Sequence, residues 1–204
     1  MKKVLIIDYG MGNLDSVFRA IQECGGTPLI SQKIEDFLDA NYIILPGVGA
    51  FSTGIKNLDK LGLDKILVKQ VSKGIPLLGI CLGMQLLATK GFEGGEREGL
   101  GLIDGEVKHF KPDQPNIRIP HIGWNEVFFK ERCPLFRGIS LGKDFYFVHS
   151  YHFVCKHPDE AVAYTPYCGQ FTSVIAKDNI FGVQFHPEKS QRVGFQLLKN
   201  FLSI

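Results

Sequence analysis

The spacing of apolar residues predicts alternating strands and helices in the first half of the chain. Short apolar runs indicate four buried strands, at residues 4–7, 28–30, 42–45 and 77–80. Between them, apolar residues three and four apart predict a helix over 14–23 and one or two helices over 54–73. Strands that alternate with helices favour a parallel sheet with right-handed crossovers.

From residue 102 the pattern changes to short β-like segments separated by Pro and Gly. Examples lie at 107–110, 126–129, 145–148 and 162–165. A strand at 181–185 and a closing helix at 193–202 follow, and residues 92–99 and 111–116 are typical of mobile loops. Without a repeat or linker, residues 1–204 form one α/β domain: a mostly parallel central sheet flanked by helices, with a β-rich C-terminal half.

Composition excludes several classes of protein. The 204 residues carry a net charge of +2 without a long basic run, which argues against a nucleic-acid partner. No apolar stretch is long enough for a signal peptide or a membrane span. The chain has an odd number of cysteines and no C-x-x-C pair, so we expect neither disulfides nor a zinc site. Free thiols suit a reducing compartment, and we expect a cytoplasmic location. The histidines show no metal-like spacing.

The most informative motif is Gly79-Ile80-Cys81-Leu82-Gly83, which follows an apolar strand and precedes a helical stretch at 84–88. Strand, tight turn and helix form a nucleophile elbow with cysteine as the nucleophile. The glycines leave room for a sharp reversal, and the helix N-terminus favours thiolate over thiol. On the motif alone, a buried structural cysteine is an equal alternative.

A base for the thiol stands near the C-terminus. His186 and Glu188 follow the strand at 181–185 and, on an extended backbone, point to the same side. A carboxylate beside an imidazole fixes its tautomer and stabilises the imidazolium. Taken alone, this motif is explained better by a solvated turn, but together with Cys81 it describes nucleophile, base and orienting group.

A third motif supplies hydrogen-bond donors for an oxyanion. The strand at 42–45 runs into Pro46-Gly47-Val48-Gly49, where glycines allow backbone amides to approach a substrate. An acyl-transfer site needs such donors. We expect the amides of Val48 and Leu82 to form the oxyanion hole, although a plain turn after a strand gives the same pattern. The three motifs all follow strands, and sites in parallel sheets lie at the carboxyl ends of strands.

In order, P-G-V-G, G-I-C-L-G-M-Q and F-H-P-E resemble the motifs of the class I (triad) glutamine amidotransferases. The resemblance covers essentially the whole chain. Flanking motifs are similar to those of the glutaminase subunits of imidazole glycerol phosphate synthases: I-D-Y-G-M-G-N, P-H-I-G-W-N, Y-F-V-H-S-Y and H-P-E-K-S.

This resemblance implies a glutaminase of histidine biosynthesis that releases ammonia through a cysteinyl thioester, with no metal or organic cofactor. A (β/α)₈-barrel cyclase subunit would receive the ammonia, in a heterodimer. The implied catalytic residues are Cys81, His186 and Glu188. The residues implied to bind glutamine are Gly47, Gly49, Gln85, Ser150 and Tyr151. Those implied to face the cyclase are Asn13, Trp124, Tyr146 and Lys189.

Other functions share parts of this pattern. A paralogue could deliver ammonia to another acceptor, such as a bacterial surface sugar, because such paralogues share the glutaminase motifs. A non-catalytic regulator conflicts with the intact triad, and a free-standing cysteine hydrolase conflicts with Gln85 and the P-G-V-G loop. Because ammonia released without an acceptor is wasted, we expect a poor glutaminase in isolation, with the loop at 46–49 as the switch.

Overall fold

The computed structural model describes residues 2–112, 117–130 and 133–204, so the loop expected at 111–116 lies mostly outside the described residues. Five parallel strands form the centre of the fold in the order β2-β1-β3-β4-β13. Their bounds are β1 (Lys3–Ile7), β2 (Thr27–Ser31), β3 (Tyr42–Leu45), β4 (Leu77–Ile80) and β13 (Ile180–Val183). The predicted mostly parallel central sheet is confirmed.

Beyond β13 the sheet continues through mainly antiparallel strands, in the order β12-β10-β7-β5-β6, and β11, β8 and β9 branch from β12. These strands are β5 (Lys90–Gly91), β6 (Arg97–Glu98), β7 (Gly105–His109), β8 (His121–Phe129), β9 (Lys143–His149), β10 (Tyr151–Cys155), β11 (Ala161–Thr165) and β12 (Phe171–Lys177). They form the β-rich C-terminal half that the sequence predicts.

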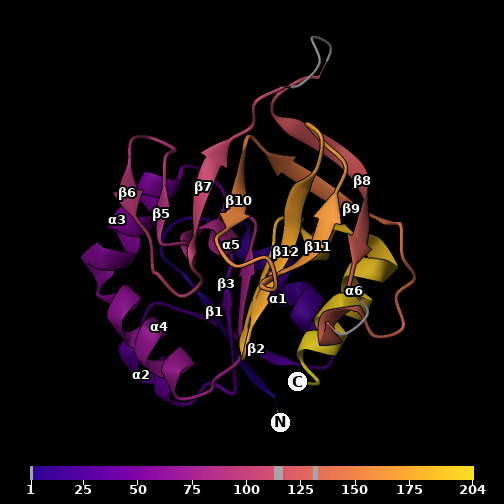
Figure 1. Ribbon diagram of the computed structural model, residues 1–204. Coiled ribbons are helices and arrows are strands. Elements are labelled where there is room, and N and C mark those ends of the chain that lie inside the picture. Colours follow the sequence, from indigo (N-terminus) through magenta and orange to yellow (C-terminus); the bar gives the residue numbers. More distant parts are fainter. Residues whose placement is uncertain (1, 113–116, 131–132) are drawn as a thin grey trace.

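Helices cover both faces of the parallel strands: α1 and α6 lie on one side and α2, α3 and α4 on the other (Figure 1). The helical segments are α1 (Leu14–Glu23), α2 (Ile34–Leu38), α3 (Phe51–Leu61), α4 (Leu63–Ser72), α5 (Leu82–Leu86), α6 (Gln191–Phe201) and the 3₁₀ turns η1 (Pro134–Phe136) and η2 (Pro187–Lys189). Strand β1 shows why two cores form. Val4 and Ile6 pack towards α1, whereas Leu5 and Ile7 pack on the opposite face.

Several boundaries differ from the sequence prediction. Helix α2 was not expected, because it is only five residues long. The helix after the nucleophile motif spans Leu82–Leu86 rather than 84–88, and β13 ends at Val183 rather than at residue 185. Strand β8 begins at His121, well before the expected residue 126. Its first half was missed because Gly123 interrupts it and its large apolar side chains, Ile122 and Trp124, are exposed.

The pairing of β4 with β13 positions the site. These strands are parallel neighbours with Ile80 opposite Val183, and the backbone N–H of Cys81 donates to the Val183 carbonyl at 2.8 Å. The segments that leave both strands at their carboxyl ends therefore emerge side by side.

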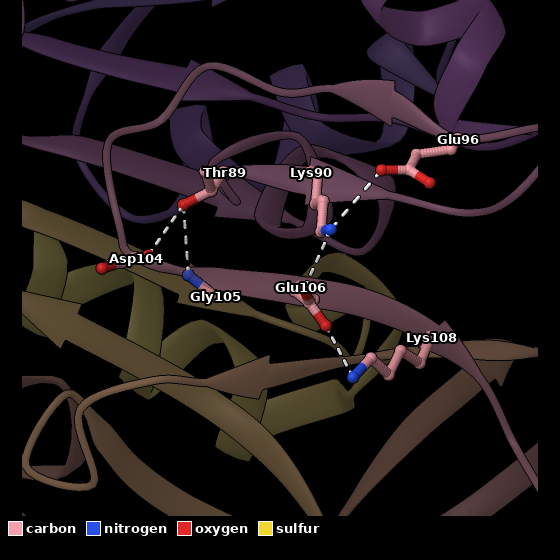
Figure 2. A network of polar contacts seen from close by, with 7 residues as sticks. All are labelled: Thr89, Lys90, Glu96, Asp104, Gly105, Glu106 and Lys108. Carbon is pink, nitrogen blue, oxygen red and sulfur yellow. Dashed lines mark hydrogen bonds and ion pairs between the residues drawn. The ribbon is translucent and has the colours of Figure 1, made fainter.

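The far edge of the sheet is closed by a short hairpin with charged side chains. Figure 2 shows Lys90 between Glu96 and Glu106, at 3.4 and 3.2 Å, with Lys108 on the other side of Glu106. Exposed ion pairs of this kind contribute little to stability, but short charged edge strands discourage pairing with another chain. No helix in the described part of the chain has the length and apolar character required to cross a membrane.

Candidate active site

Cys81 lies in a strained turn between β4 and α5. Its φ of 54° is in the left-handed region, where a non-glycine residue costs roughly 1–3 kcal/mol. The flanking glycines are required by close approach, because a Cβ at Gly83 would collide with the Leu45 carbonyl and one at Gly79 would lie 2.7 Å from the Gly83 oxygen. This is the geometry of the predicted nucleophile elbow.

The sulfur of Cys81 is buried against polar groups from two other segments, the residue that follows β13 and strand β9. The Gln184 amide nitrogen donates to Sγ at 3.7 Å, and the Val148 carbonyl oxygen lies 3.9 Å from it. Gln184 is fully buried, directly beyond β13. Sequence analysis missed Gln184, because a glutamine before F-H-P-E carries no signal of its position beside the nucleophile.

His186 and Glu188 form a buried pair, with Nδ1 of His186 2.8 Å from Oε1 of Glu188. The expected extended backbone is wrong here, since residues 187–189 form the 3₁₀ turn η2. The turn still brings the two side chains together, because Pro187 starts a tight turn that Ser190 supports by donating to the His186 carbonyl.

The charge on His186 is stabilised within the site. Burial opposes protonation, but interactions with Cys81 and Glu188 outweigh it and raise the pKa of the imidazole to about 10. Nε2 of His186 is buried, and Cys81 is the group that contributes most to raising the pKa of the imidazole. A protonated His186 beside the Cys81 sulfur can return its proton to a leaving group.

Gln85 connects helix α5 to strand β10 and to Gln184. Its amide nitrogen donates to the Tyr151 carbonyl at 2.9 Å and to the Gln184 side-chain oxygen at 3.0 Å. These two bonds use its nitrogen within the protein, so the amide oxygen of Gln85 is the atom that remains to accept a hydrogen bond from a substrate.

The loop at 46–49 lies directly beside the elbow. The Leu82 N–H donates to the Gly47 carbonyl at 3.3 Å, so one of the two expected oxyanion donors is engaged by this loop. The Tyr9 hydroxyl donates to the Pro46 carbonyl at 2.7 Å and anchors the start of the loop. Gly49 has a φ of 114°, which only glycine adopts readily.

A cavity of about 410 Å³ opens above the sulfur. Its walls contain most of the expected site residues: Val48, Gly49, Cys81, Leu82, Gln85, Ser150 and Tyr151. Glu93 also lines the cavity, and one of its carboxylate oxygens accepts the Phe51 N–H at 3.1 Å. Sequence analysis missed Glu93, because the Gly-rich segment around it indicates only a loop.

The residues expected to face a partner lie outside this cavity. Trp124 is 48% exposed and its ring packs edge-on against Tyr146, with centroids 5.9 Å apart. The Lys189 ammonium lies 5.9 Å from the centroid of the Tyr146 ring. Asn13 is exposed immediately before α1, which packs against η2. Ile122 and Phe128, 59% and 45% exposed, extend the apolar row on β8.

Comparison with known proteins identifies the family. The model of "Glutamine amidotransferase class-I" matches residues 5–204. The chain is 47% identical to the imidazole glycerol phosphate synthase subunit HisH 1 of Campylobacter jejuni, covering 98% of this chain and 100% of that protein. It is 46% identical to the subunit HisH of Lactococcus lactis, over 99% and 98% of the two chains, and 43% identical to that of Aquifex aeolicus, over 98% and 95%.

Solved structures share the fold at low sequence identity. PurLQS from Thermotoga maritima gives a TM-score of 0.75 at 19% identity, covering 100% of this chain and 99% of that one. The crystal structure of a glutamine amidotransferase from the same organism gives 0.63 at 20% identity, covering 94% and 78%. At these identities the likeness concerns the fold alone.

Proposed function

The chain belongs to the class-I glutamine amidotransferase family, and we propose that it is the glutaminase subunit of imidazole glycerol phosphate synthase, acting in histidine biosynthesis. Its glutamine amidotransferase reaction hydrolyses glutamine to glutamate and ammonia. The observation that carries the chemistry is the buried His186–Glu188 pair, which adjoins a cysteine in an elbow at the floor of a cavity.

Each step of the proposed reaction is assigned to one residue of the site. His186 accepts the Cys81 proton, and Sγ attacks the side-chain amide carbon of glutamine to give a tetrahedral oxyanion. The imidazolium returns the proton to the amide nitrogen, the C–N bond breaks, and ammonia leaves behind a glutamyl thioester. Water activated by His186 then cleaves the C–S bond, releasing glutamate and restoring the thiol.

The cavity walls contain groups that suit the α-amino acid end of glutamine. The Glu93 carboxylate would attract the α-ammonium, and the backbone of Ser150 and Tyr151 and the glycines of the loop at 46–49 would hold the carboxylate and chain. The Gln85 oxygen would accept from the side-chain amide of the substrate. No step in this scheme uses a metal or an organic cofactor.

A (β/α)₈-barrel cyclase subunit is the proposed partner, and Asn13, Trp124, Tyr146 and Lys189 are proposed to face it. The exposed apolar side chains of Ile122 and Trp124 on β8 support this, because large exposed apolar side chains grouped on one face often mark sites of protein association. The ammonia would react there with the ribulosyl aminoimidazole carboxamide nucleotide to give imidazole glycerol phosphate and aminoimidazole carboxamide ribotide.

The test is ammonia transfer by the purified chain mixed with a histidine-pathway cyclase, glutamine and the nucleotide. We expect imidazole glycerol phosphate to form with glutamine at a rate that Cys81→Ala abolishes, while free ammonium salts still support the cyclase. Glutamine hydrolysis without formation of imidazole glycerol phosphate would instead favour a paralogue with another ammonia acceptor. The same assay with a surface-sugar synthase in place of the cyclase would then test that alternative.

A further inference from the structure

Two buried histidines form a hydrogen-bonded row that ends at the cavity. Nδ1 of His149 lies 2.8 Å from the Tyr151 carbonyl oxygen, and Nε2 of His149 lies 3.1 Å from Nδ1 of His121. Nε2 of His121 lies 3.2 Å from the side-chain nitrogen of Asn125. The exposed fractions of His121 and His149 are only 3% and 7%.

The partners fix the tautomer of each ring. Since a carbonyl oxygen only accepts, His149 carries its proton on Nδ1 and accepts at Nε2. His121 must then donate from Nδ1 and accept from Asn125 at Nε2. Burial lowers the pKa of His121 to about 4 and that of His149 to about 3, so both rings are neutral near neutral pH. All three bonds therefore run in one direction, from Asn125 to Tyr151.

The row ends on the corner of backbone between β9 and β10. The Ser150 carbonyl accepts the Phe110 N–H at 3.0 Å, and the Tyr151 carbonyl accepts from both His149 and Gln85. Both carbonyl oxygens of the corner thus accept hydrogen bonds from within the protein. Its residues Val148 to Tyr151 form one wall of the cavity above Cys81.

We propose that His149 is a positioning residue for glutamine: held by His121 and Asn125, it fixes the backbone corner at Ser150 and Tyr151 against which the substrate binds. This rests on the proposed glutaminase function. Removing the row would leave Cys81, His186 and Glu188 intact but loosen one wall of the cavity. Glutamine would then bind less tightly in the ground state and in the transition state alike, which raises KM without lowering kcat.

Aromatic packing makes a selective test possible. His149 contacts Phe110 and Phe171, and His121 stacks on Tyr167 and Phe147. Phenylalanine therefore preserves the shape of either ring while removing its hydrogen bonds. Asparagine places an amide nitrogen where Nδ1 stands, so His149→Asn keeps the donor to Tyr151 and His121→Asn keeps the donor to His149.

The experiment measures glutaminase kcat and KM of each variant in complex with the cyclase and its nucleotide. We expect His149→Phe to raise KM for glutamine about tenfold, as for one lost hydrogen bond, with kcat within about twofold. His149→Asn should restore a KM near that of the wild type. His152→Phe is the matched control, since His152 stacks on the same Phe110 ring but lies outside the row, and it should leave KM unchanged.

An unchanged KM in a folded His149→Phe variant would overturn the proposal, as would an equal rise in His152→Phe. If His149→Phe does not fold, His121→Phe and His121→Asn decide: a raised KM in the first and not in the second supports the row, and equal values overturn it. A wild-type complex that does not hydrolyse glutamine at all would instead refute the proposed function.

Discussion

At the scale of single residues, the sulfur of Cys81, the proposed nucleophile, differs from the other cysteines in its position rather than in its exposure. None of the five cysteines forms a disulfide, but among them Cys81 alone lies at the cavity, with Gln184 donating to its sulfur. Cys133 is buried in an apolar core, and burial raises the pKa of its thiol. A buried thiol without a charge partner stays protonated and unreactive.

This difference predicts selective labelling. An electrophilic glutamine analogue should alkylate Cys81 and leave Cys24, Cys133, Cys155 and Cys168 unmodified, as read by peptide mass spectrometry. Cys81→Ser should abolish both labelling and glutamine hydrolysis while the thermal midpoint of unfolding changes little. Modification of Cys133 with Cys81 untouched would disprove the assignment of the nucleophile.

The charge on His186 predicts how stability depends on pH. Its pKa of about 10 in the folded protein lies above the ordinary value of 6.5, so the folded state binds this proton more tightly. The stabilisation is complete below about pH 6.5 and is lost as the pH rises towards about 10. We expect the free energy of unfolding in urea to fall over this interval.

Glu188→Gln and Cys81→Ala each remove one of the interactions that favour the imidazolium, so both should flatten this fall. Lys199→Gln, on the exposed side of α6, is a control that removes a charge far from the pair. Identical pH profiles for the wild type and both site variants would show that His186 is not stabilised as an imidazolium.

At the scale of elements, the loop at 46–49 and helix α5 act as a pair. The Gly47 carbonyl occupies the Leu82 N–H, the donor that an oxyanion would need. The Tyr9 hydroxyl holds the Pro46 carbonyl, so rotation is confined to the peptides that follow. Rotation of one peptide plane, which the glycines permit, would free Leu82 and turn a second N–H towards the cavity.

We therefore expect the isolated chain to be a poor glutaminase. The loss of one oxyanion donor costs roughly 10²–10³ in rate, so cyclase with bound nucleotide should raise kcat by a factor of this order. A steady-state assay of the chain alone, with cyclase, and with cyclase and nucleotide measures it. Full activity in the isolated chain would contradict the switch without affecting the triad.

The first half of the fold can be predicted from local patterns in the sequence, whereas the candidate site can be predicted only in part. Strands such as β4 are continuous apolar runs, and Gly79 and Gly83 mark the elbow that they frame. Gln184 and His149 could not be found in this way, because their roles depend on pairing between strands far apart in the sequence. The turn η2 was missed for a related reason: Pro187 suits both an extended backbone and a 3₁₀ turn.

At the scale of the whole molecule, two of the residues proposed to face a partner, Trp124 and Tyr146, lie side by side on β8 and β9. Trp124 and Tyr146 are directly paired across these strands, and Lys189 reaches the Tyr146 ring from η2, next to His186. The proposed cyclase surface and the proposed catalytic base, His186, thus share one short segment. We expect that binding of a partner to Lys189 affects the position of His186 directly through η2, and not through the hydrophobic core.

Alanine at Trp124, Tyr146 or Lys189 should weaken binding to the cyclase or reduce its stimulation of glutamine hydrolysis. The loss of binding free energy should be largest for Trp124, because a tryptophan that becomes buried in an interface often contributes about 2 kcal/mol or more. Calorimetric titration gives the affinity, and the ratio of glutaminase rates with and without partner gives the coupling. Val154→Ala, exposed on β10, is the control; unchanged affinity and coupling in all three variants would exclude this surface.

The parallel pairing of β4 with β13 also has an evolutionary consequence. Cys81 and His186 follow adjacent strands in fixed register, so their separation does not depend on the length of chain between them. Insertions, deletions and new hairpins between α5 and β13 can accumulate while the reacting atoms keep their places. A lineage built on this frame can exchange one ammonia acceptor for another by altering the intervening segment, and its chemistry need not be reinvented each time.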